Sequence, residues 1–200
     1  MNYKIEWIDK PMYSEDMMSE INGKKSQMDI DSLIQRIALN DSEAFDCLYS
    51  SLYRSVYAYA LSILKNKEDA EDVMQDCFLK IRASAHLYKP RNKGQAWIFT
   101  IARNLCLMKF RQKQRMMQLP FEEMDDQLVF DPNTDPALKL TLKTAFKVLN
   151  DLDHQIIVLH TVSDLKFKDI AGIMELPLPT VLSKYHRGLS KLRKELEGKL

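Results

Sequence analysis

Apolar side chains recur every three or four positions through most of this chain, which is the spacing of residues along one face of an α-helix. The pattern extends over residues 30–115 and again over residues 137–200. No segment shows the alternation typical of a strand, and the sequence contains no internal repeat. The pattern therefore predicts an all-α protein, in which residues 30–115 form an antiparallel bundle of four helices, one of them capped by Asp41.

Two segments lack this periodicity and divide the chain. Residues 1–29 scatter methionine, lysine and acidic residues, and we expect a mobile N-terminal extension there. Residues 116–136 contain three prolines, six acidic residues and no basic residue, which is typical of an extended linker. The sequence thus predicts two helical domains, 30–115 and 137–200, joined by an acidic extended linker.

Composition restricts the class of protein. The chain has 200 residues, of which 46% are hydrophobic and 28% charged, as in ordinary globular proteins. It contains no apolar run of membrane-spanning length, and its start lacks the apolar stretch of a secretory signal. The well-separated cysteines, Cys47, Cys77 and Cys106, form no CxxC pair, so we expect buried free thiols and a cytoplasmic protein.

The net charge of +1 conceals an uneven distribution of charge. Residues 30–115 carry 14 Lys and Arg against 9 Asp and Glu, and residues 137–200 carry 11 against 7. Because the local field attracts phosphate more directly than the total charge does, both basic segments are compatible with nucleic-acid binding.

The C-terminal segment has the spacing of a helix-turn-helix, the motif that places its second helix in the major groove of DNA. Ile170 and Ala171 open a short helix, and Met174 and Leu176 bracket the turn. A longer helix follows, started by Pro177 and Pro179, with an apolar face formed by Val181, Tyr185, Leu189, Leu192 and Leu196. The opposite side offers Ser183, Arg187, Ser190 and Lys194, with Lys184 and Lys191 beside them. These groups suit phosphates and base edges, and an ordinary solvated helix is the alternative.

The segment DAEDVMQDCFLKI, residues 69–81, predicts a helix with one apolar and one acidic side. The stripe expected to face the bundle is formed by Ala70, Val73, Met74, Cys77, Phe78 and Ile81. Opposite it lie Asp72, Gln75, Asp76 and Leu79. Carboxylates repel phosphate, so this side is unsuited to DNA. It is either a solvated surface or a contact for a protein partner with a basic surface.

The following helix is apolar on more than one side. Trp97, Ile101, Leu105 and Met108 form one stripe, and Phe99, Cys106 and Phe110 form a second with Arg103 beside it. Such a helix is either fully buried or presents an aromatic surface with cations around it, which stacks unpaired bases. The preceding loop carries Lys89, Arg91 and Lys93, near the path that a single strand would take.

The sequence gives little support to catalysis or metal binding. His154 and His160 are six positions apart, with no nearby cysteine or carboxylate cluster to complete a metal site. His154 with Asp151 or Asp153 is a candidate enzyme site, although Asp151 is better explained as a helix cap. We therefore expect no enzyme activity, no metal and no cofactor, and we interpret His186 as a DNA or backbone contact.

Three motifs together resemble the sigma-70 type of RNA polymerase sigma factor. DAEDVMQDCFLKIR and AWIFTIARNLCLMKFRQ each resemble a segment of sigma region 2. LKFKDIAGIMELPLPTVLSKYHRGLSKLR resembles region 4. The presence of these two regions alone is similar to the small extracytoplasmic-function (ECF) subfamily. The resemblance covers about residues 30–115 and 137–197.

The resemblance implies a transcription initiation factor that binds core RNA polymerase, directs it to promoter DNA and opens the −10 element. Its polymerase contacts would be the flap and the clamp helices of the largest subunit, and an anti-sigma factor would be a further partner. No membrane insertion is expected. The acidic linker would thread toward the polymerase active cleft.

The family's functional positions carry over to three groups of residues. The clamp helices would be bound by Asp72, Gln75, Asp76 and Leu79. The −10 element would be recognised by Lys89, Arg91, Lys93, Trp97, Phe99, Thr100, Arg103 and Asn104. The −35 element would be recognised by Thr180, Ser183, Lys184, His186, Arg187 and Lys191.

The sequence departs from the family pattern at several positions. The family usually has Gly at Glu175 and Pro179, Lys or Arg at Leu182, and Arg at Lys184, and it often has Asp at Met108. Lysine cannot make the bidentate contact of arginine, so we expect altered −35 recognition. The alternative function is a stand-alone helix-turn-helix regulator, which would bind duplex DNA tightly without polymerase.

Overall fold

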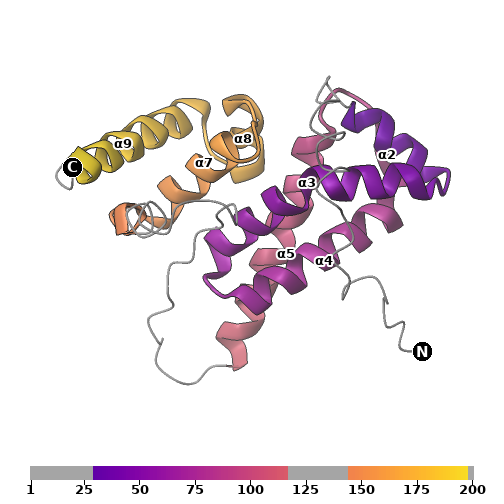
Figure 1. The fold of residues 1–200 in the computed structure, drawn as a ribbon, viewed down its shortest axis with the longest axis horizontal. Coiled ribbons are helices and arrows are strands. Elements are labelled where there is room, and N and C mark those ends of the chain that lie inside the picture. The colour runs from indigo at the N-terminus through magenta and orange to yellow at the C-terminus, as the bar shows by residue number, and fades with distance from the viewer. Residues whose placement is uncertain (1–28, 117–143, 198–200) are drawn as a thin grey trace, which may run out of the picture.

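The computed structural model describes residues 29–116 and 144–197, and the regular elements in these two ranges are all helices. The first range holds α2 (Ile30–Ala38), α3 (Ser42–Leu64), α4 (Lys67–Ser84), the short 3₁₀ helix η1 (Ala85–Leu87) and α5 (Gly94–Met116). The second holds α7 (Asp151–Thr161), α8 (Phe167–Met174) and α9 (Leu178–Glu197) (Figure 1). The predicted all-α class is confirmed. The predicted N-terminal extension and linker lie almost entirely outside the described residues.

Side-chain caps fix where several helices begin. The Asp41 carboxylate accepts a hydrogen bond from the Ala44 amide at 3.1 Å, so the predicted cap of α3 is confirmed. Asn150 caps α7 by accepting a hydrogen bond from the Asp153 amide at 2.8 Å. The prediction that Asp151 is this cap was wrong by one position, because Asp151 is already the first helical residue.

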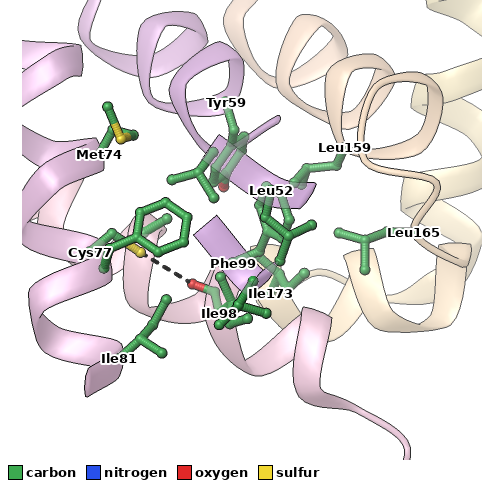
Figure 2. Close-up of a cluster of buried hydrophobic side chains, with 14 of the residues drawn as sticks. Leu52, Tyr59, Met74, Cys77, Ile81, Ile98, Phe99, Leu159, Leu165 and Ile173 are labelled. Carbon is green, nitrogen blue, oxygen red and sulfur yellow. Dashed lines mark hydrogen bonds between the residues drawn. The ribbon is translucent and has the colours of Figure 1, made fainter. Parts of the chain in front are cut away.

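The bundle core uses the face that the apolar pattern predicted on α4. All six residues of its predicted stripe are buried: Ala70, Val73, Met74, Cys77, Phe78 and Ile81. Across the core, Tyr59 of α3 meets Phe99 of α5 edge to face, with ring centroids 5.7 Å apart. Figure 2 shows the Cys77 thiol pointing at the Ile98 carbonyl, to which it donates at 3.9 Å. The bundle thus closes around side chains from α3, α4 and α5.

The three cysteines differ in their surroundings. Cys77 and Cys106 are buried, as predicted. Burial raises the pKa of Cys106 to about 12 and also raises that of Cys77, so both thiols stay protonated near neutral pH. Cys47 is exposed, so the prediction of burial was wrong for this cysteine, which lies on the solvent side of α3.

Helix α9 packs on α7 through a small residue. A Cβ atom at Gly188 would lie 2.8 Å from Ile157 Cδ1 and 3.5 Å from Asp153 Cβ, so a larger residue would force the helices apart. Leu192 is buried, whereas Leu189 is 38% exposed although it was predicted on the apolar face. Because α9 approaches α7 closely at Gly188, this residue faces α7 in place of Leu189, the neighbouring residue of the predicted stripe.

The two helical parts pack against each other. Helix α3 contacts α7 and helix α5 contacts α8, with α7–α9 lying beside the bundle in Figure 1. One hydrophobic cluster runs through both parts, so that Leu159, Leu165 and Ile173 extend toward Leu52 and Phe99 in Figure 2. No helix within the described ranges has the length and apolar character needed to cross a membrane.

Candidate functional site

The acidic side of α4 faces solvent. Asp72, Gln75 and Asp76 are exposed, and Leu79 among them is 52% exposed. Because the opposite stripe of α4 packs inside the bundle, these side chains project from a rigid element. An exposed leucine surrounded by carboxylates suits a protein surface that is apolar at its centre and basic at its rim. We call Asp72, Gln75, Asp76 and Leu79 the α4 surface.

The carboxylates of the α4 surface are not equivalent. Lys109 of α5 binds Asp72 at 2.9 Å and also lies 3.7 Å from the buried Asp69. The hydrogen bond to Asp72 is the main reason why the pKa of Lys109 is raised. Among the described residues, Asp76 takes part in no ion pair. Asp76 is therefore the carboxylate of this surface that remains available to an external cation.

A second surface, basic and partly aromatic, lies where the segment after η1 enters α5. Lys89, Arg91 and Lys93 are exposed, and the half-buried ring of Trp97 packs on Tyr88 with centroids 5.0 Å apart. These residues border a hollow of about 440 Å³. Cations around an indole provide what a single-stranded nucleic acid needs, namely phosphate neutralisation and a stacking surface.

Helix α8 forms the other wall of this hollow. Lys93 lies 3.8 Å from Asp169 of α8, and Arg103 of α5 lies 3.5 Å from Glu175 at the end of α8. The Arg103 side chain is 18% exposed, and its Nη2 also lies 3.5 Å from the Met174 carbonyl oxygen. Gln95 donates a hydrogen bond to the Ser163 carbonyl. In this arrangement α8 and the preceding turn cover part of the predicted −10 surface.

Phe99 does not belong to that surface. It was predicted to contact the −10 element, but its side chain is fully buried against Tyr59 in the bundle core. Thr100 and Asn104 are exposed, and the Thr100 hydroxyl donates to the Ala96 carbonyl at 2.8 Å. The two apolar stripes of α5 thus divide, because Phe99 packs on α3 while Trp97 stays at the margin.

The predicted −35 residues lie along α9. Ser183, His186 and Lys191 are exposed, whereas Thr180 and Lys184 are half-buried. Two cations of this group meet a buried carboxylate of α7. Arg187 contacts the oxygens of Asp153 at 3.2 and 3.4 Å, and Lys184 lies 3.6 Å away. Arg187 keeps half its side chain exposed, so it can tie α9 to α7 and still face DNA.

Each residue of the candidate enzyme site lies beside a lysine or an arginine. The Asp153 carboxylate is fully buried and engaged by Arg187 and Lys184. Asp151 is exposed and lies 3.5 Å from Lys65, while His154 is buried with Nδ1 3.5 Å from the same lysine nitrogen. Within residues 29–116 and 144–197, no three His, Cys, Asp or Glu side chains gather as metal ligands would.

One polar residue of the site was missed by the sequence analysis. Asp31 of α2 is 6% exposed, and its carboxylate accepts hydrogen bonds from the amides of Arg91, Asn92 and Gly94. Burial acts to raise its pKa, but the neighbouring Tyr88 hydroxyl and these amides outweigh burial and leave the pKa lowered. The available signal was an aspartate inside the apolar pattern of α2, which is also explained as an ordinary first-turn acid.

A helix-turn-helix beside a basic aromatic surface and a separate acidic surface is typical of a DNA-binding protein that also docks on a protein. The family described as sigma-70 region 2 matches residues 48–116, and the family described as sigma-70 region 4 matches residues 139–192. The chain belongs to the sigma-70 family of RNA polymerase sigma factors, and within it to the ECF subfamily.

Similar curated proteins have the same subfamily name. The chain is 27% identical over 183 residues to the ECF RNA polymerase sigma factor SigW of Bacillus subtilis, covering 85% of this chain and 98% of that protein. It is 26% identical over 164 residues to SigX of the same organism, covering 78% and 84%.

Solved structures share the fold. CnrH, in complex with the cytosolic domain of CnrY, is 19% identical with a TM-score of 0.61, covering 85% of this chain and 98% of that chain. The sigma factor RpoE of Bartonella quintana, in complex with the anti-sigma factor NepR, is 24% identical with a TM-score of 0.64, covering 76% and 96%. At these identities the similarity is one of fold.

Proposed function

We propose that the α4 surface docks this sigma factor on core RNA polymerase, at the clamp helices of the largest subunit. The observation that carries the proposal is the exposure of Asp76 and Leu79 on a helix whose other side is fixed in the bundle. Desolvation of Leu79 would supply affinity, and Asp76 would select a basic partner.

The remaining surfaces would then act on promoter DNA. Lys89, Arg91 and Trp97 would hold the unpaired strand of the −10 element, because cations and an aromatic ring suit a single strand. Ser183 and Arg187 of α9 would contact the −35 element, with α9 lying in the major groove and the polymerase flap supporting this part of the chain. The protein would perform no covalent chemistry, and it would work in the cytoplasm with the polymerase.

Gel filtration of the full-length chain with bacterial core RNA polymerase tests the docking proposal. Asp76→Lys should lower the affinity for polymerase at least about tenfold and so reduce co-elution, since it replaces an attraction with a repulsion at a partly desolvated interface. Asp46→Lys is the matched control, because Asp46 is an exposed acid on α3 outside the α4 surface. Equal binding by Asp76→Lys and the control would refute the assigned role.

The same measurement separates the alternative function. A wild-type chain that fails to bind polymerase but binds duplex promoter DNA tightly by itself would be a stand-alone regulator. The proposed sigma factor instead needs polymerase for promoter binding and opens the −10 element, which permanganate oxidation of unpaired thymines detects.

We propose an anti-sigma factor as a further partner. The two structural neighbours are described in complex with such a protein or with a cytosolic domain of a second protein. A protein inhibitor that occupies the α4 surface would compete directly with polymerase. A competition assay would test this assignment. A candidate inhibitor should displace the chain from core polymerase, to which the chain binds through Asp76.

A further inference from the structure

Asp31 lies in the first turn of α2, but its carboxylate serves another part of the chain. Oδ2 accepts hydrogen bonds from the amides of Arg91 at 2.9 Å and Asn92 at 2.8 Å. Oδ1 accepts a hydrogen bond from the amide of Gly94 at 2.7 Å. Two of the donors lie in the segment that joins η1 to α5 and the third is the first residue of α5, and Asp31 is 6% exposed.

The backbone of this segment is shaped around the carboxylate. Asn92 adopts the left-handed conformation, with φ of 54°, and successive amides around such a residue can point at one anion. The amides that begin a helix lack partners within it, and Lys93, the residue before α5, has no acceptor in its side chain. Asp31 therefore supplies from α2 the cap that α5 does not provide for itself.

Steric fit supports the same arrangement. A Cβ atom at Gly94 would lie 2.7 Å from Asp31 Oδ1 and 2.9 Å from both Ile30 Cγ2 and Ile34 Cδ1. Real Cβ atoms essentially never approach other atoms this closely, so a side chain here would displace the carboxylate or the backbone. The start of α5 is seated directly on α2, with the carboxylate filling the contact.

The anchored segment carries the groups assigned to the −10 element. Lys89 and Arg91 are exposed on it, and Trp97 follows in the first turns of α5. The side chains of Lys89, Arg91 and Trp97 are not held by the carboxylate, which binds backbone amides and has the Tyr88 hydroxyl beside it. The carboxylate thus fixes where these side chains start without neutralising or covering them.

We propose that Asp31 is a positioning residue for −10 recognition, which holds residues 88–93 and the start of α5 in the conformation that presents Lys89, Arg91 and Trp97 to single-stranded DNA. The proposal rests on the function proposed above. It assigns Asp31 an effect on which bases are accepted, in addition to an effect on folding. A purely structural anchor would have only the second effect.

Asp31→Asn in reconstituted holoenzyme tests the proposal. Asn replaces one accepting oxygen by an amide group that faces backbone donors, so the segment loses at least one of its hydrogen bonds. Asp29→Asn is the matched control, because Asp29 caps α2 by accepting from the Asp31 amide, and asparagine caps helices equally well. The probe is a promoter selected by the wild-type holoenzyme from DNA randomised at −10, together with its single-base −10 variants.

The expected result has two parts. Asp31→Asn should bind core polymerase within about twofold of wild type, yet form about ten- to a hundredfold less open complex on the selected promoter by permanganate reactivity. Its preference for the selected sequence over the single-base variants should fall as well. A reduction by the same factor on every promoter would show a merely structural role and overturn the proposal, as would wild-type behaviour.

A second pair of variants decides the matter if Asp31→Asn does not fold. Asn92 is exposed, so replacing it leaves the core intact. Asn92→Val should alter −10 preference, because a β-branched residue resists the left-handed conformation, while Asn92→Gly should preserve it. Identical preferences for the two variants would overturn the proposal. Failure of the wild-type holoenzyme to open any promoter would instead refute the proposed function itself.

Discussion

The turn of the helix-turn-helix contains a glutamate in a conformation that favours glycine. Glu175 has φ of 56° and ψ of 40° at the end of α8. A non-glycine residue in this conformation costs about 1–2 kcal/mol of folding free energy, which glycine would recover. The greater entropy of glycine in the unfolded chain offsets roughly 0.4–1 kcal/mol of that recovery. Through its effect on the backbone alone, Glu175→Gly should therefore stabilise the folded turn by about 1 kcal/mol.

The same substitution removes a contact between the two helical parts. Glu175 lies 3.5 Å from Arg103, but its side chain is 76% exposed, so this ion pair is worth at most about 1 kcal/mol. Losing it should raise the population in which α8 has left the −10 surface by up to about fivefold. We thus expect Glu175→Gly to leave stability nearly unchanged while strengthening binding of a single-stranded oligonucleotide to the free chain.

Chemical denaturation and fluorescence anisotropy with a single-stranded oligonucleotide measure the two effects. Glu175→Gln is the control, because it removes the charge but keeps the strained backbone, and it should lose stability without a compensating gain. A double-mutant cycle with Arg103→Ala isolates the ion pair. A loss of more than about 2 kcal/mol in Glu175→Gly, or oligonucleotide binding weaker than that of wild type, would refute this account of the turn.

Three further outcomes follow from particular contacts. Arg187→Ala should reduce −35-dependent transcription and also lower thermal stability, because it leaves buried Asp153 with one cation fewer, whereas Arg187→Lys should restore stability more than transcription. Phe99→Ala should destabilise the fold by about 3–5 kcal/mol in denaturation, while Trp97→Ala should chiefly weaken single-strand binding. The lowered pKa of Asp31 contributes stability that is fully present above its unfolded value of about 3.9 and lost as pH falls through the folded value, so Asp31→Asn should flatten the acid limb of a stability–pH curve.

The periodicity of apolar residues and the local chemistry of single side chains predict the helices, one helix cap and the family motifs of this protein. The spacing of apolar residues identified the α4 stripe and placed Asp72 and Asp76 on its outer side, because a helical wheel depends only on residues close in sequence. Asp41 was predictable as a cap for the same reason. The resemblance to sigma regions 2 and 4 likewise rests on contiguous motifs, which the two family matches confirm.

Long-range packing determines which of several apolar or charged faces meets which neighbour. Helix α5 is apolar on two sides, and packing against α3 buries Phe99 rather than leaving it for DNA. The sequence assigns Arg187 to DNA alone, whereas in the structure its guanidinium also contacts the buried Asp153 carboxylate of α7. Asp31 serves amides 60 or more positions away, as their sequence separations show. A pattern of residues along the sequence specifies the direction in which each side chain leaves its helix. The neighbour that the side chain meets there depends on packing between segments far apart in the sequence.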